Sequence, residues 1–358
     1  MTEVKTTGLE YPDQSDAFIE RMKIQSMTQM ARPTVAVLGI GGAGSNIVSW
    51  IKSKGIEGGK LIAANTDASH LSISNADRRI LIGEKLTRGR GCGGYPNKGI
   101  EAGRESLDDI KRETAGANIV FLCAGLGGGT GTGAIQVYAK ELRSANSLII
   151  GVVTLPFLVE KYRYEIAKDA MRNLQGLCDT VVTIDNSKLS QVAGNRPLQQ
   201  ALGVANELVG NFVKGITETV TAASLINIDY ADLRAIMERR GIAAIGVGER
   251  NGKNRVEHAV RQALDSQLLD IKDISRSQGV LVHVAGVNDI TLEEVTRAGE
   301  LVTKSLPPNV RIIWGANIDP KMNGDARVMV VLTGVESTFL NNNSKWSMGS
   351  LKFGSKEK

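Results

Sequence analysis

A glycine-rich segment between a strand and a helix is the feature that most constrains this chain. Residues 124–133 have the sequence AGLGGGTGTG, with six glycines and two threonines. The apolar residues 118–124 predict a strand, and residues 134–142 have the spacing of a helix. A loop at a helix N-terminus presents backbone N–H groups and partial positive charge to anions, and glycine lets phosphate oxygens come close. We therefore expect a phosphate-binding loop; the alternative is a flexible connection.

A second glycine-rich loop follows a short strand near the start of the chain. Residues 34–38 predict this strand, residues 39–46 (GIGGAGSN) form the loop, and residues 47–52 predict a helix. Two helix N-termini supply about one positive charge, which is less than a nucleoside triphosphate carries, so we infer a bound Mg²⁺ ion. No lysine stands where a Walker loop would place one.

The second loop also fits a dinucleotide-binding pattern. Gly39, Gly41 and Gly44 match Gly-x-Gly-x-x-Gly, and Asp67 follows at a distance suited to holding a ribose. This match leaves open a dinucleotide-dependent oxidoreductase, in which the first loop would have no role.

The composition excludes several classes of protein. The 358 residues are 42% hydrophobic and 23% charged, which is typical of a globular protein with room for two cores. The net charge of +5 is small and the basic pairs are scattered, so we expect no nucleic-acid partner. The three cysteines and three histidines are dispersed, which argues against a disulfide framework, a zinc site or a histidine-centred active site.

The chain is expected to be cytoplasmic. Its longest apolar run, residues 148–159, is interrupted by Pro156 and is too short to span a bilayer, so we expect no direct insertion into a membrane. The amino terminus has acidic residues and no apolar core of an export signal.

Short apolar segments alternate with helical ones from Pro33 onward. This alternation predicts an α/β fold with a doubly wound parallel sheet, in which ligands bind beyond the carboxyl ends of the strands. Pro197 opens a helix of about 25 residues whose apolar positions are three or four apart. Beyond this central helix we expect a smaller α+β domain, with strands at 243–247, 280–285, 312–317 and 328–332 and helices at 256–264 and 292–301.

Four parts of the chain follow from these patterns. They are an N-terminal extension with an amphipathic stretch at 16–30 (1–32), a nucleotide-binding domain that includes the central helix (33–226), the α+β domain (227–335) and a disordered tail rich in Asn and Ser (336–358).

Several motifs together resemble the tubulin/FtsZ family of filament-forming GTPases, and within it the FtsZ branch. The resemblance begins with the run GGGTGTG at 127–133 and covers the chain from about Pro33 to Val335. The further motifs are ANTDA at 64–68, GRGCGGYP at 89–96, VTLPF at 153–157 and NIDYAD at 227–232. The segment RIIWG at 311–315 is more similar to archaeal members than to bacterial ones.

This resemblance implies a GTPase of cell division that binds GTP or GDP with Mg²⁺ and assembles head to tail into a homopolymer at the division site. A tubulin-like filament for cell shape is the related alternative. The tail contains an apolar cluster, residues 346–353 (WSMGSLKF), that could bind a membrane-tethering division protein.

The resemblance also implies a set of site residues. Asn227, Asp229 and Asp232 would enter the pocket of the neighbouring subunit and position the attacking water; as single carboxylates, the two aspartates could equally be helix caps. The implied nucleotide contacts are Gly41, Gly42, Ala43, Gly44, Asn46, Asp67, Cys92, Gly93, Gly94, Gly127, Gly128, Gly129, Thr130, Gly131, Thr132, Gly133, Pro156, Glu160, Arg163, Asn186, Leu202 and Glu207.

Base recognition departs from the family pattern. Asn186 matches a guanine-contacting asparagine, whereas Glu207 stands where the family usually has an aspartate. Leu202 replaces the usual aromatic residue that stacks on the base, at a cost of about 0.5–1.5 kcal/mol. Arg163 lies one residue closer to the ribose-contacting Glu160 than the family arginine does, so its role is open.

Overall fold

The computed structural model describes residues 32–143, 146–193, 196–221, 228–265, 274–304, 306–308, 310–319, 322 and 324–341. The expected N-terminal extension, apart from Arg32, and the apolar cluster of the tail lie outside these residues.

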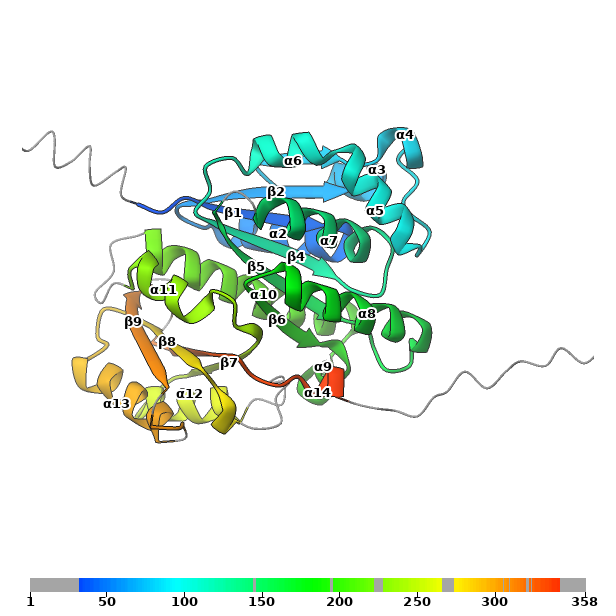
Figure 1. Cartoon of the computed structure of the whole chain (residues 1–358). Coiled ribbons are helices and arrows are strands. Elements are labelled where there is room, and N and C mark those ends of the chain that lie inside the picture. The colour runs from blue at the N-terminus through cyan, green and yellow to red at the C-terminus, as the bar shows by residue number, and fades with distance from the viewer. Residues whose placement is uncertain are drawn as a thin grey trace, which may run out of the picture. The chain divides into compact units, whose positions relative to one another are not determined.

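One ten-stranded sheet runs through the described part of the chain (Figure 1). Its spatial order is β3-β2-β1-β4-β5-β6-β7-β10-β8-β9. The strands are β1 (Val35–Ile40), β2 (Gly59–Asn65), β3 (Arg78–Leu81), β4 (Ile119–Gly125), β5 (Leu148–Leu155), β6 (Thr180–Asp185), β7 (Gly241–Arg250), β8 (Gly279–Gly286), β9 (Arg311–Ile318) and β10 (Ala326–Thr333).

The first six strands form the doubly wound parallel sheet that the alternating pattern predicts. All their pairings are parallel, and the strand order reverses between β1 and β4. Such a reversal is the place where doubly wound sheets bind ligands.

Helices cover both faces of the sheet. They are α2 (Gly41–Lys54), α3 (Ala68–Ile73), α4 (Glu84–Thr87), α5 (Pro96–Glu105), α6 (Leu107–Glu113), α7 (Thr130–Leu142), α8 (Lys161–Leu177), α9 (Asn186–Ala193), α10 (Leu198–Thr221), α11 (Tyr230–Met237), α12 (Arg255–Leu264), α13 (Leu292–Thr303) and α14 (Thr338–Asn341). A short 3₁₀ helix spans Ile274–Arg276.

Two hydrophobic cores lie on opposite faces of the sheet. Along β4, Leu122 belongs to the core beneath α7, α8, α12 and α13, whereas its neighbour Phe121 belongs to the core beneath α2, α10 and α11. Phe121 meets Phe212 of α10 edge to face, with ring centroids 5.9 Å apart. Burial on both faces explains why the parallel strands are nearly continuous apolar runs.

The central helix α10 and the C-terminal strands extend this frame. Strand β7 pairs in parallel with β6 over three residue pairs, from Thr180–Gly241 to Val182–Ala243. Beyond β7, β10 is antiparallel to both β7 and β8, and β9 is parallel to β8. The C-terminal part is therefore mixed, as an α+β domain requires, but its strands continue the first sheet.

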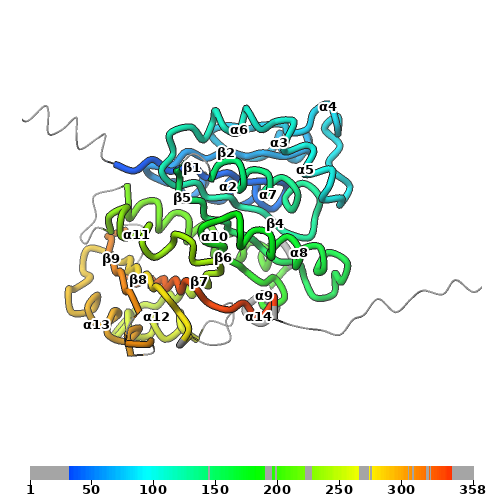
Figure 2. The backbone as a smooth tube through the Cα atoms, in the orientation of Figure 1, coloured from blue at the N-terminus to red at the C-terminus, as the bar shows by residue number. Residues whose placement is uncertain are grey.

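Three boundaries differ from the sequence-based expectation. Helix α2 begins at Gly41, so most of the expected second loop is the first turns of a helix. Helix α7 begins at Thr130, which reduces the first loop to residues 126–129. Residues 336–341, which we expected to belong to a disordered tail, include α14 at Thr338–Asn341, which packs against α8 (Figure 2).

Candidate nucleotide site

A cavity of about 390 Å³ lies at the carboxyl ends of β1, β4, β5 and β6. The phosphate-loop and second-loop glycines meet there, at the reversal of strand order. The cavity is lined by Ile40, Gly41, Gly42, Ala43, Gly125, Leu126, Gly128, Gly129, Thr130, Gly131, Thr154, Leu155, Pro156, Glu160, Arg163 and Asn186.

The loop between β4 and α7 is held in place by its own hydrogen bonds. Gly127 adopts φ +94°, and a Cβ atom there would lie 2.8 Å from the Arg163 carbonyl oxygen, so glycine is required. The Gly127 N–H donates to Thr132 Oγ1 at 2.9 Å, and the Leu126 N–H donates to the Thr154 carbonyl at 2.9 Å. This bonding leaves Gly128 and Gly129 facing the cavity in a fixed geometry.

Two of the predicted contacts are used within the protein. Thr132 is buried and its hydroxyl accepts from Gly127, while the Gly133 N–H donates to the Gly129 carbonyl at 3.0 Å. Thr132 and Gly133 therefore shape the loop rather than face the cavity.

The cavity has little positive charge of its own. Among the described residues that line it, Arg163 is the one basic side chain, and its Nη1 donates to Glu160 Oε1 at 2.8 Å. Glu160 Oε2 also accepts from the Phe157 N–H at 3.2 Å. Anion binding therefore depends on the N-termini of α2 and α7, whose first residues line the cavity.

Asn186 brings an amide into the cavity. Its backbone starts α9 directly after β6, and its Oδ1 is buried without a hydrogen-bond partner in the structure. A buried amide oxygen left unpaired costs about 1–3 kcal/mol, so its satisfaction by a ligand is favoured. This position supports the predicted contact with a base.

The segment with Cys92, Gly93 and Gly94 packs on the phosphate loop from outside the cavity lining. A Cβ atom on Gly129 would lie 2.7 Å from the Cys92 Cβ and 2.9 Å from the Tyr95 nitrogen. The loop and this segment therefore touch at van der Waals distance.

Gly127 and five other predicted contacts are not among the residues that line the cavity. Asp67 caps α3 by accepting the His70 N–H at 3.0 Å. The Cα of Gly44 packs against β4, where a Cβ would meet the Cys123 carbonyl oxygen at 2.3 Å. The remaining three, which are exposed on α2 and α10, are Asn46, Leu202 and Glu207.

Sequence reasoning missed five lining residues: Ile40, Gly125, Leu126, Thr154 and Leu155. They are the last residues of β1, β4 and β5, or lie directly after them. The rule that ligands bind at the carboxyl ends of parallel strands was the signal that could have found them.

Asp229 and Asp232 lie at the opposite end of the strands. Asp229 is the N-cap of α11 and accepts the Asp232 N–H at 2.8 Å, so the expected capping role is present. The next residue, Tyr230, donates its hydroxyl to the carbonyl of Asn118, which directly precedes β4. Strand β4 has seven residues. At about 3.3 Å per residue, these carboxylates are roughly 20 Å from the cavity in the same molecule. Figure 1 shows α11 at the end of the sheet where the strands begin.

Asp232 has a partner from the C-terminal strands, whereas Asn227 lies outside the described residues. The Asp232 Oδ1 accepts from Arg311 Nη2 of β9 at 3.0 Å, with both side chains half exposed. The carboxylates are therefore held in place but open to solvent.

Within the described residues, no group of three or more His, Cys, Asp or Glu side chains is arranged to hold a metal ion. In the same part of the chain no helix combines the length and apolarity needed to cross a membrane.

Comparison with known proteins identifies the family. The tubulin/FtsZ family GTPase domain matches residues 34–194, and the FtsZ family C-terminal domain matches residues 241–336. Cell division protein FtsZ 2 of Methanocaldococcus jannaschii is 44% identical over 306 residues, 85% of this chain and 80% of that protein. The chain belongs to the tubulin/FtsZ family. It is a GTPase of the FtsZ branch, a branch of cell division proteins, and this membership sets aside the oxidoreductase alternative.

Further relatives agree with this assignment. Cell division protein FtsZ 1 of Archaeoglobus fulgidus is 45% identical over 307 residues, 86% of this chain and 83% of that protein. The solved structure of an empty FtsZ dimer from M. jannaschii has a TM-score of 0.84 and 44% identity, covering 88% of this chain and 92% of that one. The CetZ2 protofilament of Haloferax volcanii, at 23% identity and a TM-score of 0.73, shares the fold.

Proposed function

We propose that this GTPase of cell division assembles head to tail, and that each active site is completed by the adjacent subunit. The observation that carries the proposal is the separation of the cavity and the two aspartates by the length of β4. One molecule has both parts but cannot bring them together. Stacking the α11 end of one copy on the cavity of the next would do so.

Each part has a chemical role in this arrangement. The α2 and α7 N-termini with Gly128 and Gly129 bind the phosphates of GTP or GDP, and Asn186 contacts guanine. Asp229 and Asp232 of the neighbour orient the water that attacks the terminal phosphorus, which is the main task of protein groups in phosphoryl transfer. Asn227 would approach the same water.

Mg²⁺ would compensate the phosphate charge that Arg163 alone does not balance. Because no metal-ligand cluster is present in the described residues, phosphate oxygens and water would hold the ion, which is usual for Mg²⁺.

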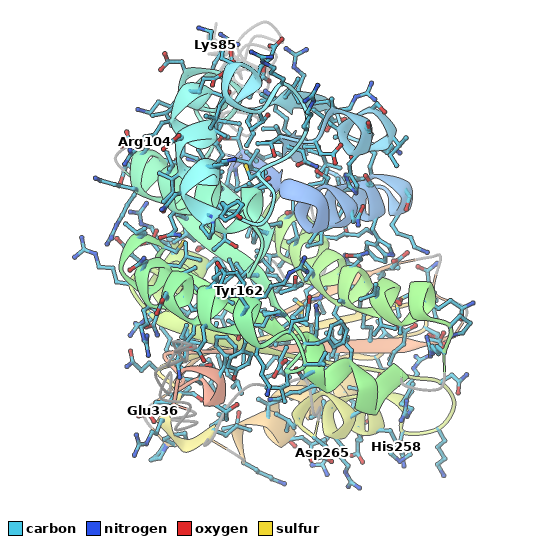
Figure 3. All side chains as sticks on the ribbon, turned by 90° about the vertical axis from the view of Figure 1, so that its right-hand side faces the viewer. Lys85, Arg104, Tyr162, His258, Asp265 and Glu336 are labelled. Carbon is cyan, nitrogen blue, oxygen red and sulfur yellow. The ribbon has the colours of Figure 1, made fainter. Side chains whose placement is uncertain are left out.

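Exposed apolar side chains around the cavity support its coverage by a second copy. Leu158 is 59%, Val159 84% and Tyr162 72% exposed, and they flank the cavity residues Glu160 and Arg163. Figure 3 shows Tyr162 in the middle of the face toward which the first strands point. Apolar groups grouped in this way mark interaction surfaces.

Mixing two inactive variants tests the shared site. Asp232→Ala keeps its cavity but cannot supply the carboxylate, whereas Thr130→Arg blocks its cavity but keeps Asp229 and Asp232. We expect each variant alone to release almost no phosphate. An equimolar mixture should recover activity, because about a quarter of random head-to-tail junctions pair an intact cavity with intact carboxylates. Sedimentation of the mixture checks that both variants associate; association without recovered phosphate release would contradict the shared site.

We also propose where the protein acts and how its chain is divided. The protein acts in the cytoplasm at the division site. A membrane-tethering division protein recruits it there by binding the 342–358 tail, and the apolar cluster at 346–353 is the binding segment. The boundaries 33–226 and 227–335 remain our proposed division of the folded part.

A further inference from the structure

Thr66 lies where three segments around the phosphate loop meet. It follows β2 and is fully buried. Its carbonyl oxygen accepts the Gly91 N–H at 3.1 Å and lies 3.4 Å from Thr87 Oγ1, whose hydroxyl is closer to the Gly83 carbonyl oxygen, at 3.0 Å. Its side chain bonds a different segment: Oγ1 lies 2.6 Å from Oγ1 of Thr130, the first residue of α7.

Cys92 completes a row of hydrogen-bonding side chains. Its Sγ lies 3.6 Å from Thr66 Oγ1, within the range of a thiol donor, and it is buried at 3% exposure. Thr130, at the other end of the row, is half-buried and lines the cavity. The row therefore runs from the protein interior to the place where phosphate would bind.

Each side chain in this row has one proton, so the direction of one hydrogen bond sets the direction of the next. A hydroxyl donates one hydrogen bond and accepts up to two, whereas a thiol is a weak donor and a weak acceptor. When Cys92 donates to Thr66, the Thr66 proton is free to bond Thr130 Oγ1. The Thr130 proton then has no acceptor within the row and is free to bond a group in the cavity.

We propose that Cys92 and Thr66 orient the Thr130 hydroxyl as a hydrogen-bond donor to a nucleotide phosphate. Thr66 is a positioning residue, because it acts through Thr130 and does not line the cavity. The opposite direction, with Thr130 donating to Thr66, would turn an oxygen lone pair toward an anion. Bonds from a hydroxyl to a charged oxygen are stronger than neutral ones, so bound phosphate favours the proposed direction. This inference rests on the proposed placement of the phosphates in the cavity.

Nucleotide binding by single and double variants tests the row. Thr66→Val keeps the shape but removes the hydroxyl, Thr66→Ser keeps the hydroxyl, and Thr130→Val removes the final donor. Fluorescence titration of the full chain with labelled GDP and Mg²⁺ gives each dissociation constant. We expect about tenfold weaker binding for Thr130→Val, about fivefold for Thr66→Val and less than twofold for Thr66→Ser.

The double variant separates positioning from packing. If Thr66 acts through Thr130, Thr66→Val/Thr130→Val binds no more weakly than Thr130→Val alone. Thr183→Val is the matched control, since Thr183 is equally buried and its hydroxyl has no partner in the structure. It should bind GDP as the wild type does. Thermal unfolding without nucleotide confirms that each variant folds.

The outcomes distinguish this inference from the proposed site. Three results would overturn the hydroxyl row alone, provided that the wild type binds GDP. Thr66→Val could bind GDP as tightly as the wild type, the losses of affinity in the double variant could be additive, or Thr66→Ser and Thr66→Val could lose equal affinity. If Thr130→Arg instead binds the nucleotide as tightly as the wild type does, the proposed placement of phosphate in this cavity is wrong, and so is the hydroxyl row.

Discussion

Asn186 and His283 are two of the buried side chains with a polar atom that has no partner in the structure, and they differ in what surrounds them. Asn186 Oδ1 faces the nucleotide cavity, where a base can satisfy it. His283 of β8 lines a separate cavity beside α10, three strands from β6 in the sheet, and its Nε2 is the unpaired atom. The first predicts an effect on binding, and the second an effect on stability.

Replacing Asn186 should reduce the preference of the cavity for guanine over adenine nucleotides. Guanine presents two N–H donors beside its carbonyl, and adenine does not present this set, so we expect GTP to displace labelled GDP far better than ATP does. Asn186→Ala should reduce affinity for GTP about tenfold and narrow the preference over ATP. Asn75→Ala, on the exposed loop after α3, is the control and should change neither. Equal competition by GTP and ATP with the wild type would contradict guanine recognition.

His283 should make stability fall in mild acid. Burial, assisted by the nearby Arg327 charge, lowers its pKa to about 4. The unfolded chain has a histidine pKa of about 6.5, so between pH 6.5 and 4 the unfolded state binds the extra proton. The free energy of unfolding is therefore highest above pH 6.5, and it decreases by up to about 3 kcal/mol as the pH falls toward 4.

Urea unfolding at pH 7 and pH 5 measures this loss. His283→Gln should flatten the difference between the two pH values, whereas His258→Gln, at an exposed position of α12, should keep it. An unchanged pH dependence in His283→Gln would show that other groups cause the effect.

At the scale of elements, α11 has both a structural and a proposed catalytic task, and these are separable. Asp229→Asn keeps an oxygen that can accept the Asp232 N–H, so its free energy of unfolding should stay within about 0.5 kcal/mol of wild type. Asp229→Ala loses the cap and should lose about 1 kcal/mol. Both should release phosphate much more slowly, because each lacks the carboxylate. Full activity in Asp229→Asn would reduce Asp229 to a helix cap.

The strands and the chief helices were predictable because their patterns are local. Apolar runs such as residues 119–123 are buried on both faces in β4, and the spacing after Pro197 is found in α10. Helix starts were harder to place. Gly41 and Thr130 lie inside glycine-rich stretches that favour loops, yet both begin helices because the strands before them fix the chain direction.

Part of the site was predictable and part depended on tertiary contacts. The phosphate loop was expected from its glycine-rich motif at a strand end and Asn186 from the family resemblance, and both line the cavity. The Thr132 bond to Gly127 and the Thr66 contact with Thr130 join residues whose relation appears only when the loops fold together. The opposite placement of Asp229 likewise follows from the contact of Tyr230 with Asn118, which is 112 residues away in sequence.

At the scale of the whole molecule, the path of the chain returns from the last strand to the GTPase part. Phe339 of α14 is buried and its ring lies 4.5 Å from that of Tyr164 in α8. No local pattern predicted this contact, because a four-residue helix has too little periodicity to detect. The continuous sheet was also unforeseen, since the three helices α9, α10 and α11 separate β6 from β7 along the chain.

Two truncations should separate the tail from the fold. Removing residues 342–358 leaves Phe339 in place, so thermal stability and phosphate release should match the wild type. Recruitment of the labelled protein to the division site should be lost if the tail binds the membrane tether. Removing residues 336–358 also deletes Phe339 and should lower the free energy of unfolding by about 3 kcal/mol. Unchanged recruitment after the shorter deletion would place the tether contact elsewhere.

In the proposed head-to-tail polymer, the separation of cavity and carboxylates by the length of one strand gives the two tips different surfaces. At one tip a cavity is open and lacks a neighbour's aspartates; at the other the aspartates project with no cavity to enter. A chain of subunits therefore always has one fewer complete active site than it has members. Under this proposal the nucleotide at the open tip is hydrolysed only after another subunit is added there, so each addition at that tip completes one active site.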